Sequence, residues 1–75
     1  MSPEGIIARA LNVDPSLVTD ETTNKTLPEW DSLAHMTMIM EFETAYGVTL
    51  SAEDALLMTS VRAIKQKLSD YGVQW

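Results

Sequence analysis

Apolar residues recur at helical spacing in several stretches of the chain, and polar segments separate them. The first stretch follows Ser2 and Pro3, which suit an N-cap and a first helical position because proline lacks an N–H that would stay unpaired there. Gly5 weakens this helix by about 0.5–1 kcal/mol relative to alanine. The pattern predicts a helix over residues 3–11, with apolar positions at Ile6, Ile7, Ala10 and Leu11.

The periodicity stops between Asn12 and Trp30. Asp14-Pro15 is a turn signal, and the segment Thr19–Thr26 is mostly polar. A loop of this length in a small domain is usually functional or packed down by its own apolar residues. The candidates for that packing are Leu17, Val18, Leu27 and Trp30.

A strong helical pattern then begins after Asp31, the expected N-cap, and runs to about Tyr46, with Gly47 as the residue that ends it. Ser51-Ala52-Glu53-Asp54 is a variant capping box that predicts a short helix through about Leu57. Thr59 or Ser60 is expected to cap the last helix. Its apolar positions are Val61, Ile64, Leu68 and Tyr71.

These elements predict the fold class: an all-α bundle of three longer helices and one short helix. The helical faces that should meet in one core are those of Ile6, Ile7, Phe42, Tyr46, Val61, Ile64 and Leu68.

The helix expected over residues 32–46 has two apolar sides. At 100° per residue, one side is wide enough to face the core, with His35 beside it. This side consists of Met38, Ile39, Phe42 and Tyr46. Leu33, Met36 and Met40 lie on roughly the opposite side, next to Thr37 and Thr44. We expect this second side to be exposed, at least in part, as a docking surface, because the flexible methionine side chain adapts to different partners.

Length and composition indicate one domain over residues 1–75 with a modest core, since a chain this short buries only about 60% of its surface. Little room remains for a deep catalytic pocket. The absence of cysteine excludes disulfides, thiolate nucleophiles and thiolate metal sites. The formal net charge of −6 disfavours nucleic-acid binding and suits basic protein partners.

No apolar run is long enough to span a bilayer, so membrane insertion is not expected. The opening Met1-Ser2-Pro3-Glu4 lacks the basic start of a secretory signal, which favours a cytoplasmic location. The presence of Met1 favours a free-standing protein over a domain of a larger synthase.

The segment Trp30-Asp31-Ser32-Leu33-Ala34-His35 resembles the Asp-Ser-Leu attachment motif of the acyl carrier protein family. The resemblance covers nearly the whole chain. The long loop ends directly at the motif, the segment Glu43–Leu50 is similar to the family's helix end and link, and Thr59-Ser60-Val61 resembles the start of its last helix.

The resemblance implies a non-catalytic carrier, expected to be a monomer, with covalent phosphopantetheine from coenzyme A on Ser32. Asp31 would cap the helix and assist the modifying enzyme, and Leu33 completes the motif. The implied partners are a phosphopantetheinyl transferase and the acyl-loading and acyl-processing enzymes of fatty-acid, polyketide or related biosynthesis. They would dock on Leu33, Met36, Met40 and Glu41.

The chain departs from the family's commonest form at two places. Glu29-Trp30 stands where many members have a glycine, and Thr37, Thr44 and Ala45 dilute the acidic residues of the second helix. Docking is therefore expected to depend more on apolar contacts than on charge. The tryptophan resembles discrete carriers of specialised pathways.

The residues also permit interpretations besides an acyl carrier. Ser32 and His35 are three residues apart on a helix and could form a hydrolase pair, although no glycine-rich nucleophile turn is present. Asp14, Asp20 and Glu21 do not match the spacing of a calcium loop, and we interpret them as solvated acids and caps, with no metal site. A peptidyl or aminoacyl carrier and an unmodified helical interaction module are both compatible with the same helical pattern.

Overall fold

Four α-helices and one 3₁₀ turn make up the secondary structure of the computed structural model, which describes residues 1–75. In chain order they are α1 (Pro3–Leu11), η1 (Pro15–Leu17), α2 (Ser32–Tyr46), α3 (Ala52–Leu57) and α4 (Val61–Asp70). The predicted fold class is confirmed, with the short 3₁₀ turn as an addition inside the long loop.

The predicted helix ends are confirmed by their capping hydrogen bonds. Ser2 Oγ accepts from the N–H of Gly5 at 3.1 Å, and Ser51 Oγ accepts from the N–H of Asp54 at 3.1 Å. Of the two candidates for the last cap, the structure uses Ser60 and not Thr59. Gly47 ends α2 in the left-handed region (φ 65°), where a side chain would be strained.

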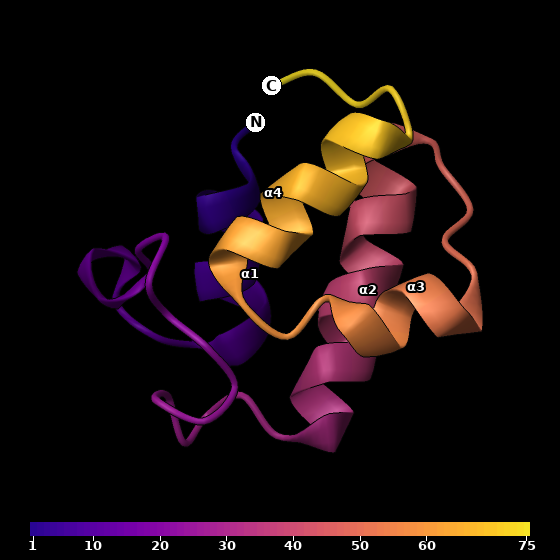
Figure 1. Ribbon diagram of the computed structural model, residues 1–75. Coiled ribbons are helices and arrows are strands. Elements are labelled where there is room, and N and C mark those ends of the chain that lie inside the picture. The colour runs from indigo at the N-terminus through magenta and orange to yellow at the C-terminus, as the bar shows by residue number, and fades with distance from the viewer.

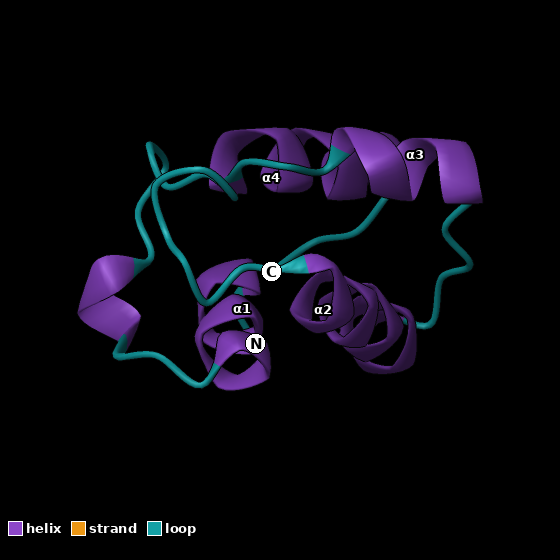
Figure 2. Cartoon of the chain, turned by 90° about the horizontal axis from the view of Figure 1, so that it is seen from below, coloured by secondary structure: helices purple, strands orange, loops and turns teal.

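The helices form two layers. Figure 2 shows α1 and α2 next to each other in one layer, with α3 and α4 lying across the other. The core lies between these layers and includes the predicted side chains of Ile6, Ile7, Phe42, Val61, Ile64 and Leu68, each no more than 1% exposed. Tyr46 packs against this core but stays half-buried, and its hydroxyl donates to the carbonyl oxygen of Met1 at 2.9 Å.

Three of the four apolar loop residues pack as predicted: Val18, Leu27 and Trp30 are buried. The prediction for Leu17 is wrong, because its side chain is 51% exposed. Leu17 ends the 3₁₀ turn η1, and the adjacent Val18 takes the inward position instead. The backbone carbonyl of Leu17 is still used, since it accepts from the hydroxyl of the buried Thr22 at 2.9 Å.

None of the helices combines the length and the apolar character needed to cross a membrane.

Candidate functional site

The candidate site is the start of α2, which lies at the end of the bundle away from both chain termini (Figure 1). Asp31 has extended backbone geometry, and its Oδ1 accepts from the N–H of Ala34 at 2.8 Å. Ser32 follows as the first helical residue, and its side chain is exposed. The predicted N-cap role of Asp31 is therefore confirmed, and the hydroxyl of Ser32 is open to a reaction partner.

The first turn of α2 leaves backbone donors free beside Ser32. The N–H groups of Ser32 and Leu33 have no acceptor within the protein, while those of Ala34 and His35 bond to Asp31. Free N–H groups and the positive end of the helix dipole favour an anion there by about 0.3–1 kcal/mol. A phosphodiester on Ser32 Oγ fits this environment.

A chain of side-chain hydrogen bonds joins the loop, α2 and α3 behind Ser32. The indole Nε1–H of Trp30 donates to Nδ1 of His35 at 2.9 Å, and Nε2 of His35 lies 2.8 Å from the carbonyl oxygen of Ala55. Because the indole can only donate, Nδ1 must be the acceptor, and Nε2 therefore carries the proton that it donates to Ala55. The neutral form of His35 fits both contacts.

This geometry does not place His35 as a base for Ser32. Both ring nitrogens of His35 are engaged, with Trp30 and with Ala55, and neither bonds to Ser32. His35 is partly buried, and Trp30, which was predicted to pack the loop down, is only 3% exposed.

An open depression of about 530 Å³ lies beside Ser32, between the start of α2, the end of α3 and the loop. It brings the residues at the start of α2 together with residues of the preceding loop, of α3 and of the α3–α4 link. They are Asn24, Trp30, Asp31, Ser32, His35, Met36, Leu56 and Thr59.

The second apolar side of α2 is exposed along its length. The exposed fractions are 75% for Leu33, 62% for Met36 and 63% for Met40. On the other side of the same helix Met38, Ile39 and Phe42 are buried. The predicted division of α2 into a core side and an exposed apolar side is therefore confirmed, while its use for docking is a proposal.

Two further exposed apolar residues, Leu56 and Leu57 on α3, were not predicted as part of any site. No residue of α3 is buried. A helix of only 6 residues has too little periodicity to indicate whether its leucines are buried or exposed, so the sequence carried no usable signal. Leu56 lines the same depression as Met36, which extends the apolar surface from α2 onto α3.

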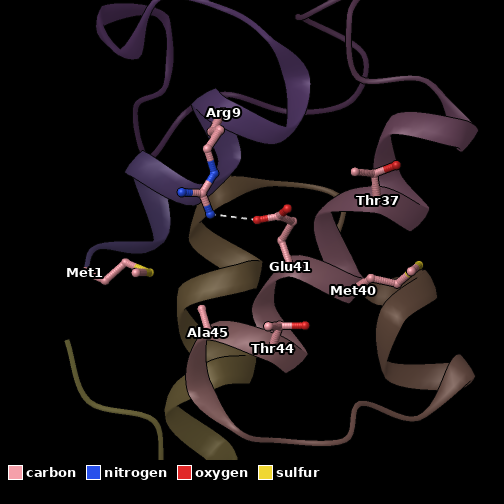
Figure 3. A pocket seen from close by; sticks show the side chains of 7 residues that line it. All are labelled: Met1, Arg9, Thr37, Met40, Glu41, Thr44 and Ala45. Carbon is pink, nitrogen blue, oxygen red and sulfur yellow. Dashed lines mark hydrogen bonds and ion pairs between the residues drawn. The ribbon is translucent and has the colours of Figure 1, made fainter.

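Glu41, the acidic member of the predicted docking set, is paired within the protein. Its Oε2 lies 2.7 Å from a guanidinium nitrogen of Arg9, so the ion pair links α2 to α1. Figure 3 shows this pair in a second shallow depression, next to Met1 and Met40. The pairing reduces the charge that Glu41 presents to a partner, which is in line with a docking surface dominated by apolar contacts.

The acidic loop residues have structural partners. Asp14 caps η1, and Glu21 pairs with Arg62 at 2.7 Å. Lys65 donates to both Glu4 and Asp20, and these hydrogen bonds lower the pKa of each carboxyl and raise that of Lys65. No three histidine, aspartate or glutamate side chains are grouped closely enough to bind a metal ion.

Comparison with protein-family models and with curated proteins finds no match. The function must therefore be inferred from the residues at the start of α2 and their surroundings.

Proposed function

We propose that this protein is an acyl carrier protein and that Ser32 is the attachment residue for phosphopantetheine. The observation that carries the proposal is the position of Ser32. It is an exposed hydroxyl at the first residue of α2, directly after the N-cap Asp31 and within an Asp-Ser-Leu motif. The resemblance to the carrier family supports the same assignment.

The attachment reaction needs only a hydroxyl from this chain. Ser32 Oγ would form a bond to the phosphorus that carries the pantetheine in coenzyme A. The phosphoanhydride bond to that phosphorus would break, and 3′,5′-adenosine bisphosphate would leave. The hydroxyl proton would pass to a base on the transferase, because His35 has no free nitrogen to accept it. The catalysis therefore comes from the partner enzyme.

The attached arm would supply what the chain lacks, a thiol on which acyl groups are held as thioesters. This chain would hold the phosphodiester through the free N–H groups of Ser32 and Leu33. Asp31 would keep α2 capped at the point of attachment. The carboxylate of Asp31 also places a negative charge beside the phosphodiester. Because this chain and coenzyme A are both negatively charged, a basic surface on the transferase would be needed to bring them together.

Partner enzymes would bind the exposed apolar side of α2 next to the arm. Leu33, Met36 and Met40 are all more than 60% exposed, which is a large apolar surface for a domain of this size. Since Glu41 is paired with Arg9, the contact would be mainly apolar, with charge affecting how fast partners associate.

A thiol-labelling experiment tests the proposal. The unmodified chain has no cysteine and cannot react with a maleimide. After incubation with coenzyme A and a phosphopantetheinyl transferase, we expect the purified protein to take up one maleimide. A protein that stays unlabelled after this treatment would favour an unmodified helical interaction module.

A further inference from the structure

The depression beside Ser32 has one apolar wall and one polar wall. Met36 from α2 and Leu56 from α3 form the apolar wall. Asn24 from the loop and Thr59 from the α3–α4 link form the polar wall, and they are held together by the hydrogen bond from Asn24 N to Thr59 O at 3.0 Å. The side-chain amide of Asn24 and the hydroxyl of Thr59 have no partner within the protein, so both can bond to a ligand.

Trp30 and His35 separate this depression from the core. Trp30 is 3% exposed, and through His35 it is tied to the carbonyl of Ala55 on α3. None of the fully buried core side chains borders the depression. An apolar chain that entered between α2 and α3 at this point would have to break these bonds, which would leave polar groups unpaired in a desolvated position.

We infer that this depression holds the pantetheine arm together with a short, polar acyl group, and that Trp30 and His35 exclude long apolar chains from the bundle interior. The inference rests on the proposed function. Pantetheine contains amide groups, which match the donor and acceptor groups of Asn24 and Thr59. A long apolar chain would instead stay in contact with water on this open surface, because its burial is blocked.

The experiment uses isotope-labelled protein loaded with an acetyl, a hydroxybutyryl or an octanoyl arm. Mass spectrometry first confirms that each arm is attached. We expect two-dimensional NMR spectra to show shifts at the amides of Asn24, Leu56 and Thr59 upon loading. The core amides of Phe42, Ile64 and Leu68 should not shift with any of the three acyl groups. The melting temperatures of the acetyl and octanoyl forms should also agree.

Two outcomes on the loaded wild-type protein would overturn the inference while the carrier function stands. One is a spectrum in which Asn24, Leu56 and Thr59 do not respond to the arm. The other is an octanoyl form with shifted core amides or a raised melting temperature. If no arm attaches at all, the proposed function fails, and this inference fails with it.

Variants test whether the side chains that line the depression cause the arm-dependent shifts and whether Trp30 and His35 keep the octanoyl chain out of the core. The double variant Asn24→Ala/Thr59→Val should lose the arm-dependent shift at Leu56, whereas Thr49→Val, at an exposed site in the α2–α3 link, should keep it. His35→Ala should gain octanoyl-dependent shifts in the core. If that variant does not fold, Trp30→Phe keeps an aromatic ring but lacks the donor to His35, and it should show the same gain. If the core amides stay unshifted in a folded variant, Trp30 and His35 do not exclude the octanoyl chain from the core.

Discussion

The indole of Trp30, the last loop residue but one, donates a hydrogen bond to the ring of His35, one turn into α2. The Nε1–Nδ1 distance is 2.9 Å, and the two ring planes lie 19° apart with centroids separated by 6.2 Å, so the rings meet edge to edge. The loop is thereby fixed to the helix that it introduces, and Ser32 lies between the two residues in sequence. This contact holds the backbone on both sides of the candidate attachment residue.

We expect Trp30→Phe to destabilise the protein by about 1–3 kcal/mol, because it leaves Nδ1 of His35 without its donor. Urea denaturation measures the change. Trp75→Phe is the matched control, since Trp75 is 49% exposed at the terminus, and it should change stability by less than about 0.5 kcal/mol. Equal stability of the two variants would contradict the anchoring role of Trp30.

Phe42→Ala should cost about 3–5 kcal/mol, which threatens the fold of a domain this small. Phe42 is fully buried at the centre of the core, and its ring stacks on that of Tyr46. Thermal or urea unfolding gives the value, and Thr44→Ala on the exposed side of α2 serves as the control. A Phe42→Ala protein as stable as the wild type would mean that the core side of α2 is assigned wrongly.

Most of this fold could be predicted from local sequence patterns. The helix starts depend on short-range capping by Ser2, Asp31 and Ser51, and each of these side chains accepts from a backbone N–H three residues ahead. The core face of α2 follows from the spacing of Met38 and Phe42. These signals lie within a few residues of one another in the chain, which is why the sequence reveals them.

The contacts that could not be predicted are those between distant segments. The bond from His35 to Ala55 spans 20 residues, and that from Lys65 to Glu4 spans 61. Leu17 and Val18 are adjacent apolar residues in a loop without periodicity, so the sequence does not indicate which of them turns inward. The walls of the depression beside Ser32 likewise come from Asn24, Leu56 and Thr59, which only the tertiary fold brings together.

The pairing of Lys65 with Glu4 and Asp20 predicts a specific pH dependence. Its Nζ lies 2.7 Å from Oε2 of Glu4 and 3.0 Å from Oδ1 of Asp20. The hydrogen bonds from Lys65 lower the pKa of both carboxyls. The two ion pairs therefore stabilise the folded protein fully above the carboxyl pKa values of the unfolded chain, which are ~4. This stabilisation is lost as the pH falls through the lowered pKa values of the folded protein. The pKa of Lys65 is raised, mainly by Glu4 and then by Asp20, so its contribution is lost only as the pH rises through that raised value.

Lys65→Met should therefore lower the melting temperature at neutral pH and reduce the further loss of stability upon acidification below about pH 5. Lys25→Met is the control, since Lys25 is exposed and forms no ion pair. Melting curves across the acidic range give the comparison. If Lys65→Met and the wild type lose stability in parallel, the ion pairs do not contribute to acid sensitivity.

Met40→Glu should slow acyl transfer by partner enzymes and leave the fold intact. Met40 is 63% exposed on the proposed docking side of α2, so a carboxylate there would disturb an apolar contact without entering the core. Thr49→Glu adds the same charge at an exposed site in the α2–α3 link and should transfer at the wild-type rate. Unfolding of Met40→Glu in circular dichroism would show that this side belongs to the core.

The central claim is that Ser32 alone accepts phosphopantetheine, and intact-protein mass spectrometry tests it most directly. With coenzyme A and a broad-specificity transferase, the wild type should gain the mass of one arm. Ser51→Ala, which changes the N-cap of α3, should gain the same mass, and Ser32→Ala should gain none. An unchanged wild-type mass would contradict the carrier function, and a modified Ser32→Ala protein would contradict the assignment of the site.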